Sequence, residues 1–68
     1  MSLSKREHDV LLYIADGLVE KEIALKLGIG QGTVHSYITS MKNKMNALTR
    51  AHAVSIYYRE YPKWEIKA

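Results

Sequence analysis

The 68-residue chain contains no cysteine, which excludes a disulfide framework and a cysteine-ligated zinc site. The chain has three histidines, His8, His35 and His52, and they do not have the spacing of metal ligands. No apolar run approaches the roughly 20 residues of a transmembrane helix, and no signal-peptide pattern is present. Neither a cofactor nor a small-molecule ligand is indicated. We therefore expect one cytoplasmic domain over residues 1–68 that binds no metal, cofactor or membrane.

Acidic residues are absent between Glu22 and Glu60. Residues 1–30 carry four basic and five acidic side chains, whereas residues 31–68 carry six basic and two acidic ones. A polyanion could approach the surface formed between Glu22 and Glu60 without meeting a carboxylate. The charge distribution therefore favours a nucleic-acid partner.

Apolar residues recur at helical spacing in four segments, and no strand alternation is visible, so the expected fold class is all-α. The predicted helices cover residues 5–16, 20–27, 31–45 and 50–61, and a tail follows over 62–68. Ser4 and Glu7 form a capping-box pattern before the first helix. Gly28 suits a left-handed turn after the second helix. In the tail, Trp64 and Ile66 could fold back onto the domain.

The second and third predicted helices are separated by a three-residue turn, 28–30. This is the outline of a helix-turn-helix, whose second helix can enter a DNA major groove. The apolar stripe of helix 31–45 consists of Val34, Ile38, Met41 and Met45. At about 100° per residue, the side chains opposite this stripe are those of Gly32, Ser36, Thr39 and Asn43, which we call the groove face. It is flanked by His35 and Lys42 on one side and by Thr33, Ser40 and Lys44 on the other.

Slim hydrogen-bonding side chains suit a helix that enters a groove. We expect base contacts from His35, Ser36, Thr39 and Asn43. We expect phosphate contacts from Gln31, Thr33, Lys42 and Lys44. Because the first two turns of the helix carry no Arg or Lys, specificity should depend on hydroxyl, histidine and water-mediated contacts and on DNA shape.

Taken together, these segments resemble the LuxR/GerE-type helix-turn-helix domain of bacterial transcription regulators. The matching fragments span about residues 3–58 and include Leu3-Ser4-Lys5-Arg6-Glu7, Lys21-Glu22-Ile23-Ala24, Thr33-Val34, Lys44-Met45 and Ala53-Val54. The resemblance implies four helices, of which the third reads the major groove and the fourth forms a dimer contact. It assigns base reading to His35, Ser36 and Thr39, and phosphate contact to Thr33, Lys44 and Arg50.

The chain departs from the family pattern in the region that should meet DNA. The family usually has an acidic residue and a lysine where this chain has Gln31 and Gly32, and it often has lysine at His35. A capping Ser or Thr is replaced by Val19 and Gly30. These departures affect the DNA sequence that is read more than the fold.

The predicted helix 50–61 carries more apolar circumference than one core-facing stripe needs. We expect a homodimer that places two reading helices on adjacent half-sites. The expected interface residues are Val54, Tyr57, Tyr58 and Tyr61. In the alternative, one tyrosine packs on the core and the others lie on the surface.

The sequence thus predicts a sequence-specific domain for double-stranded DNA in bacterial transcription regulation. An alternative is a protein-interaction adaptor or antagonist with the same fold, which the neutral groove face and the tyrosines would suit. A third is a sigma-factor-like promoter-reading domain, which requires RNA polymerase as a partner. No catalytic residue is expected, because Ser36 has no accompanying histidine-and-acid set.

Overall fold

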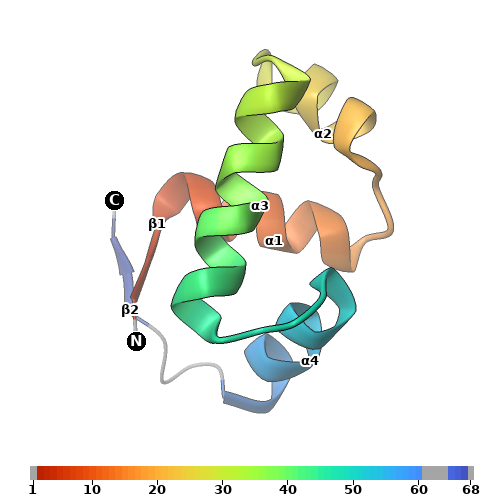
Figure 1. The fold of residues 1–68 in the computed structure, drawn as a ribbon. Coiled ribbons are helices and arrows are strands. Elements are labelled where there is room, and N and C mark those ends of the chain that lie inside the picture. The colour runs from red at the N-terminus through yellow and green to blue at the C-terminus, as the bar shows by residue number, and fades with distance from the viewer. Residues whose placement is uncertain (1, 61–64, 68) are drawn as a thin grey trace.

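The computed structural model describes residues 2–60 and 65–67. Its helices are α1 (Lys5–Ala15), α2 (Glu20–Leu27), α3 (Gln31–Met45) and α4 (Arg50–Glu60), and its strands are β1 (Ser2–Ser4) and β2 (Glu65–Lys67) (Figure 1). The all-α fold class is confirmed, and α2 and α3 begin and end at the predicted residues. The first helix ends one residue earlier than predicted. The predicted last residue of α4, Tyr61, lies outside the described residues.

The start of α1 is fixed by the predicted capping box. The Glu7 amide donates to Ser4 Oγ over 3.1 Å, and the Ser4 amide donates to Glu7 Oε1 over 2.7 Å. These two bonds satisfy backbone donors that no helical carbonyl can reach. The capping box therefore also fixes the Glu7 carboxylate next to the first turn of α1.

The turn between α2 and α3 depends on a left-handed residue. Gly28 has a φ of 67°, and the Ile29 amide donates to the Ala24 carbonyl over 3.1 Å. Asn46 ends α3 in the same way, with a φ of 56°. Both helices thus end in left-handed caps, which favour glycine and tolerate asparagine.

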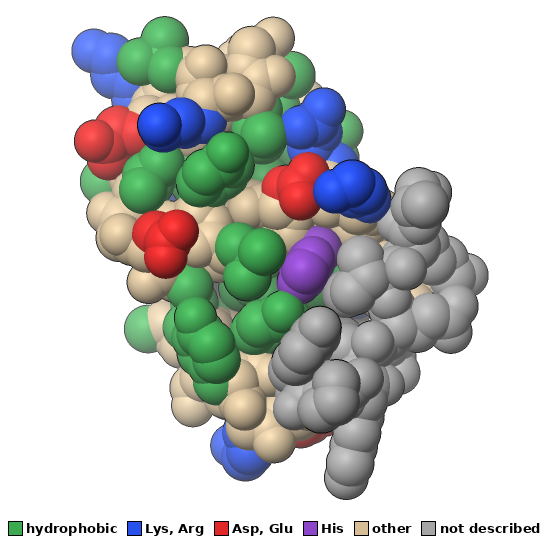
Figure 2. Space-filling model, turned by 180° about the vertical axis from the view of Figure 1, so that it is seen from behind, with side chains coloured by type: hydrophobic (Ala, Val, Ile, Leu, Met, Phe, Trp, Pro, Cys, Tyr) green, Lys and Arg blue, Asp and Glu red, His purple; other side chains and the backbone are tan. Residues whose placement is uncertain are grey.

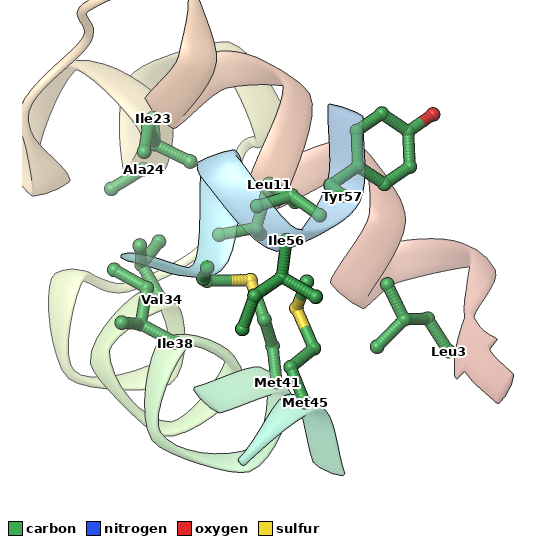
Figure 3. Packing of buried hydrophobic residues seen from close by; sticks show 12 residues of the cluster. Leu3, Leu11, Ile23, Ala24, Val34, Ile38, Met41, Met45, Ile56 and Tyr57 are labelled. Atoms are coloured by element: carbon green, nitrogen blue, oxygen red, sulfur yellow. The ribbon is translucent and has the colours of Figure 1, made fainter. Parts of the chain in front are cut away.

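The core receives side chains from all four helices and from β1 (Figure 3). Its members are Leu3, Val10, Leu11, Ile23, Ala24, Val34, Ile38, Met41, Met45, Ala53, Ile56 and Tyr57. The whole predicted apolar stripe of α3 is among them, so the opposite side of that helix faces outward. The described residues contain no helix with the length and hydropathy of a membrane span.

A short parallel strand pair joins the two ends of the chain. β1 and β2 pair in the register Ser2–Glu65, Leu3–Ile66 and Ser4–Lys67. The backbone of the tail therefore returns to the domain at Ile66, which the sequence left open, whereas Trp64 lies outside the described residues. The strands themselves were not predicted, because three residues are too few to show an alternating pattern.

Candidate nucleic-acid interface

The groove face of α3 is exposed along its whole length. Gly32, Ser36, Thr39 and Asn43 are all exposed, and so is His35 beside them. One surface depression of about 440 Å³ lies along the helix, and its lining residues are His35, Ser36, Thr39, Ser40, Asn43 and Lys44. The structure therefore brings the four residues predicted to read bases together on one surface.

The Ser36 hydroxyl is already oriented by its own helix. Ser36 Oγ donates to the Gly32 carbonyl over 3.2 Å. A hydroxyl that donates its hydrogen to the helix backbone can still accept hydrogen bonds at its two lone pairs. In this orientation Ser36 presents a hydrogen-bond acceptor on the groove face.

A buried carboxylate holds the opposite flank of the face. Glu7 is only 3% exposed, and its carboxylate accepts hydrogen bonds from Ser40 Oγ and, over 2.7 Å, from Lys44 Nζ. The Ser4 amide adds a third donor. Because Glu7 belongs to α1 and the two side chains to α3, these contacts tie the C-terminal half of α3 to the start of α1.

This arrangement strongly favours the ionised carboxylate. Burial raises the pKa of Glu7, but the hydrogen bonds from Lys44, Ser40 and Ser4 lower it by more, to about 2 from the ordinary value of 4.5. The carboxylate therefore stays charged at neutral pH. Lys44, predicted to contact phosphate, is held in an ion pair at the edge of the depression, with 43% of its side chain exposed.

A second carboxylate lies against the other flank. Glu20 Oε2, at the start of α2, is 3.3 Å from His35 Nδ1 and 3.6 Å from a guanidinium nitrogen of Arg50. Its side chain is 24% exposed, and that of His35 is 68% exposed. One oxygen thus joins a predicted base-reading residue on α3 to a predicted phosphate contact on α4.

The two carboxylates correct one expectation from the sequence. The expectation that a polyanion meets no carboxylate on the surface formed between Glu22 and Glu60 is wrong. Charge was counted along the chain, whereas the fold brings Glu7 and Glu20 from α1 and α2 to α3. The burial of Glu7 and its pairing with Lys44 limit the repulsion from that side.

The other predicted phosphate contacts differ in exposure. Gln31 and Thr33 are exposed in the first turn of α3, and Lys42 is half-buried in its last turn.

Within residues 2–60, no group of three or more acidic, histidine or cysteine side chains is arranged to hold a metal ion.

The structure separates the predicted interface residues of α4. Tyr57 is buried in the core, and its hydroxyl hydrogen-bonds His8 Nε2 over 2.7 Å. Its assignment to a dimer surface is therefore corrected: Tyr57 packs inward, and the partner that sequence reasoning missed is His8 on α1. Val54 is half-buried and Tyr58 is 65% exposed. Tyr61 lies outside the described residues.

The face of the molecule drawn in Figure 2 carries more apolar side chains than the groove face does. Figure 2 shows apolar side chains gathered there among single acidic and basic ones. Two depressions lie away from the groove face, one lined by Leu18, Glu22, Leu25 and Lys26 and the other by Asp9, Leu12, Tyr13, Asp16 and Leu27. Slim hydrogen-bonding side chains are thus concentrated on α3, and bulky apolar ones on α1 and α2.

Comparison with known proteins identifies relatives for most of the chain. Residues 1–57 match the family model described as bacterial regulatory proteins, luxR family. The transcriptional regulatory protein YdfI of Bacillus subtilis is 46% identical over 54 residues, which are 79% of this chain and 25% of that protein. For the uncharacterized transcriptional regulatory protein YvfU of the same organism, the identity is 43% over 79% of this chain and 27% of the relative.

A third relative comes from another organism. The HTH-type transcriptional activator RamA of Corynebacterium glutamicum is 47% identical over 53 residues, 78% of this chain and 19% of that protein. The chain spans about a quarter of the length of the Bacillus relatives and a fifth of RamA.

Proposed function

Because the chain belongs to the luxR family of bacterial regulatory proteins and is a DNA-binding domain of a transcription regulator, we propose that α3 enters the major groove of double-stranded DNA. The domain belongs to a family of regulators, not of enzymes. Its base-reading residues are His35, Ser36, Thr39 and Asn43. Its phosphate contacts are Gln31, Thr33, Lys42, Lys44 and Arg50.

The observation that carries this proposal is the exposed, slim and uncharged groove face. An α-helix fits into a major groove when its leading side chains are small enough to let the backbone approach the base edges. At Gly32 an added Cβ would meet no atom of the described residues within 4 Å beyond its chain neighbours and the adjacent backbone of α3, so the missing side chain serves no packing need within the described part of the domain. An exposed glycine in a helix costs up to about 1 kcal/mol relative to alanine. Close approach to DNA would account for that cost.

The proposal is tested by removing the hydrogen-bonding groups of the face together. We expect the Ser36→Ala, Thr39→Ala and Asn43→Ala triple variant to bind a duplex selected from a random pool at least tenfold more weakly, with little change on random duplexes. Each lost base contact costs about 1 kcal/mol or more in discrimination. Fluorescence anisotropy gives the affinities, and thermal melting checks the fold. Unchanged affinity for the selected duplex in a folded triple variant would overturn the proposal.

Phosphate contact is better tested at Lys42 than at Lys44, because Lys44 also pairs with Glu7. We expect Lys42→Gln to weaken binding to all duplexes and to lower the salt slope by about one unit. Lys26→Gln is the matched control, since Lys26 lines a separate depression on α2. A wild-type duplex affinity that does not fall with salt would instead favour the protein-interaction adaptor.

We further propose that two copies bind adjacent half-sites through α4. Val54 and Tyr58 are four residues apart and so share a helix face, and Tyr58 is largely exposed. Tyr61 is included in this proposal, whereas Tyr57 is not. Sedimentation of the domain with a two-site duplex tests it: Tyr58→Ser should reduce the two-copy complex, and two-copy binding as tight as wild type would refute the contact.

We also propose the kind of protein to which this domain belongs, its location and its partner. Residues 1–68 form one domain of a bacterial transcription regulator, which acts on DNA in the cytoplasm. RNA polymerase is the proposed partner of that regulator. A sigma-factor-like role is the competing case, and it requires promoter binding that depends on polymerase, which footprinting with and without polymerase would reveal.

A further inference from the structure

We propose that Glu20 is a positioning residue that fixes the tautomer and orientation of His35, so that His35 Nε2 accepts a hydrogen bond from the amino group of an adenine or a cytosine in the major groove. This inference rests on the proposed function, because it requires α3 to lie in that groove. It goes further by naming the chemical class of base that one residue reads.

The contact between Glu20 and His35 determines which ring nitrogen carries the proton. Glu20 Oε2 lies 3.3 Å from His35 Nδ1. An ionised carboxylate can only accept, so Nδ1 must carry the hydrogen in this contact. In a neutral imidazole the other nitrogen then has a free lone pair. Nε2 is therefore an acceptor as long as the contact to Glu20 persists.

The surroundings of Glu20 restrict its movement. Arg50, at the start of α4, lies 3.6 Å from the same carboxylate oxygen. Glu20 is the more buried partner in both pairs, with 24% of its side chain exposed against 46% for Arg50 and 68% for His35. The carboxylate is thus held between α3 and α4 and provides a fixed support for the exposed imidazole.

The position of His35 leaves Nε2 available to DNA. The residue lines the α3 depression together with Ser36 and Thr39. No described residue bonds Nε2, since the hydrogen bond of His35 within residues 2–60 is the one at Nδ1. The ring is thus anchored at Nδ1, and Nε2 is free for a ligand at the flank of the groove face.

Base-edge chemistry then gives the preference. In the major groove the amino groups of adenine N6 and cytosine N4 are donors, whereas guanine and thymine present acceptors. A fixed Nε2 acceptor pairs with the first two and opposes the others at its contact position. In the opposite tautomer Nε2 would donate, and the preference would be reversed.

The test is duplex selection from a random pool at pH 8, where an ordinary imidazole is neutral. The His35→Ala variant first identifies the base position at which preference is lost. At that base pair we expect the wild-type domain to prefer the amino group: deleting it from adenine or cytosine (purine or 2-pyrimidinone in its place) should weaken binding, and deleting the carbonyl oxygen of the partner base should not. We expect Glu20→Gln to reduce that preference about tenfold, because an amide can accept from or donate to Nδ1 and so permits both tautomers.

Glu22→Gln provides the matched control. Glu22 lies in the same first turn of α2, but its carboxylate accepts from the Val19 amide over 3.0 Å, and among the described residues it has no hydrogen bond or ion pair to α3. Both variants remove one negative charge, so both should bind random duplexes slightly more tightly. Only Glu20→Gln should change the base preference, whereas a purely structural role of Glu20 would change stability and leave that preference intact.

The outcomes separate this inference from the proposed function. An unchanged preference for the amino group in folded Glu20→Gln would overturn the role of Glu20. A wild-type domain that loses affinity on deletion of the guanine or thymine carbonyl oxygen, and not of the amino group, would overturn the assigned tautomer. In either case the Ser36, Thr39 and Asn43 triple variant would still lose its selected duplex. If neither His35→Ala nor the triple variant alters selection, the proposed function fails as well.

Discussion

Glu7 and Glu20 have similar positions in their helices, but they differ in burial and in the contribution to stability that we expect from each. Each lies in the first turn of one helix and reaches α3, Glu7 at Ser40 and Lys44 and Glu20 at His35. Glu7 is almost fully buried and accepts three donors from Ser4, Ser40 and Lys44. Glu20 is partly exposed, and its contacts are longer, at 3.3 and 3.6 Å. Together the two carboxylates flank the groove face.

The difference shows how burial separates stability from specificity. Within residues 2–60, Glu7 is the one charged side chain that is buried, and loss of a partner would leave its charge uncompensated. Water screens the contacts of Glu20, which should contribute little to stability. Glu7 therefore fixes where α3 lies, and we expect Glu20 to fix only how one side chain of α3 is presented.

The largest expected effect is the loss of the Glu7 contribution in acid. The pKa of Glu7 is lowered from 4.5 to about 2 in the folded state, so its contribution is fully present above pH 4.5. It is lost as pH falls from 4.5 toward 2, and it amounts to about 3 kcal/mol. Urea unfolding between pH 7 and pH 2.5 measures this loss. Glu7→Gln should flatten the acid dependence and Glu20→Gln should not; equal flattening in both would remove the distinction between the two carboxylates.

Removing the cation that pairs with Glu7 should have the next largest effect. We expect Lys44→Met to reduce the free energy of unfolding at pH 7 by about 2–3 kcal/mol, since it leaves a buried carboxylate with neutral donors only. Urea denaturation gives the value, and Lys26→Met on exposed α2 is the control. A loss no greater than that of the control would mean that Lys44 does not stabilise the buried charge.

A smaller effect is expected at the neutral donor. Ser40→Ala removes the hydroxyl bound to Glu7 and should cost about 1.5–2 kcal/mol, the lower part of the usual range for a hydrogen bond to a charged group. Ser36→Ala is the paired comparison, because within the described part of the chain the exposed Ser36 hydroxyl bonds only the Gly32 carbonyl. Thermal melting should rank Ser40→Ala well below Ser36→Ala, and a reversed order would contradict the role of Glu7 as an anchor.

The smallest effect on stability is expected at Glu20. Glu20→Gln should change the free energy of unfolding by less than about 0.5 kcal/mol, because its ion pairs are exposed and screened. The same denaturation curves, recorded in low and high salt, provide the measurement. A loss above 1 kcal/mol would show that Glu20 holds the helices together and does not merely orient His35.

Local patterns in the sequence were sufficient for much of the fold. The bounds of α2 and α3 followed from spacing, from Gly28 and from the apolar stripe, and the capping box at Ser4 and Glu7 needed only four consecutive residues. The outward face of α3 followed from helical geometry alone. All these features depend on neighbours within a few turns of helix.

Contacts between distant segments could not be predicted in this way. Ser40 and Lys44 are spaced to share a face of α3, but nothing local indicates that the capping residue Glu7 is their partner. In the same way, His8 and Tyr57 become partners only once α1 and α4 are packed. Which tyrosine of α4 is buried, and where acidic groups lie relative to α3, depend on this packing.

The strand pair at the chain ends has a consequence for the order of folding. Pairing Leu3 with Ile66 joins residues at nearly the greatest possible separation in the chain. Such a contact contributes strongly to contact order, and loop-closure entropy opposes it until the helices have shortened the intervening path. We therefore expect β1 and β2 to pair last and open first. Native-state hydrogen exchange should show the β1 amides exchanging faster than those of α3, and slower exchange in β1 would contradict the early opening of the strand pair.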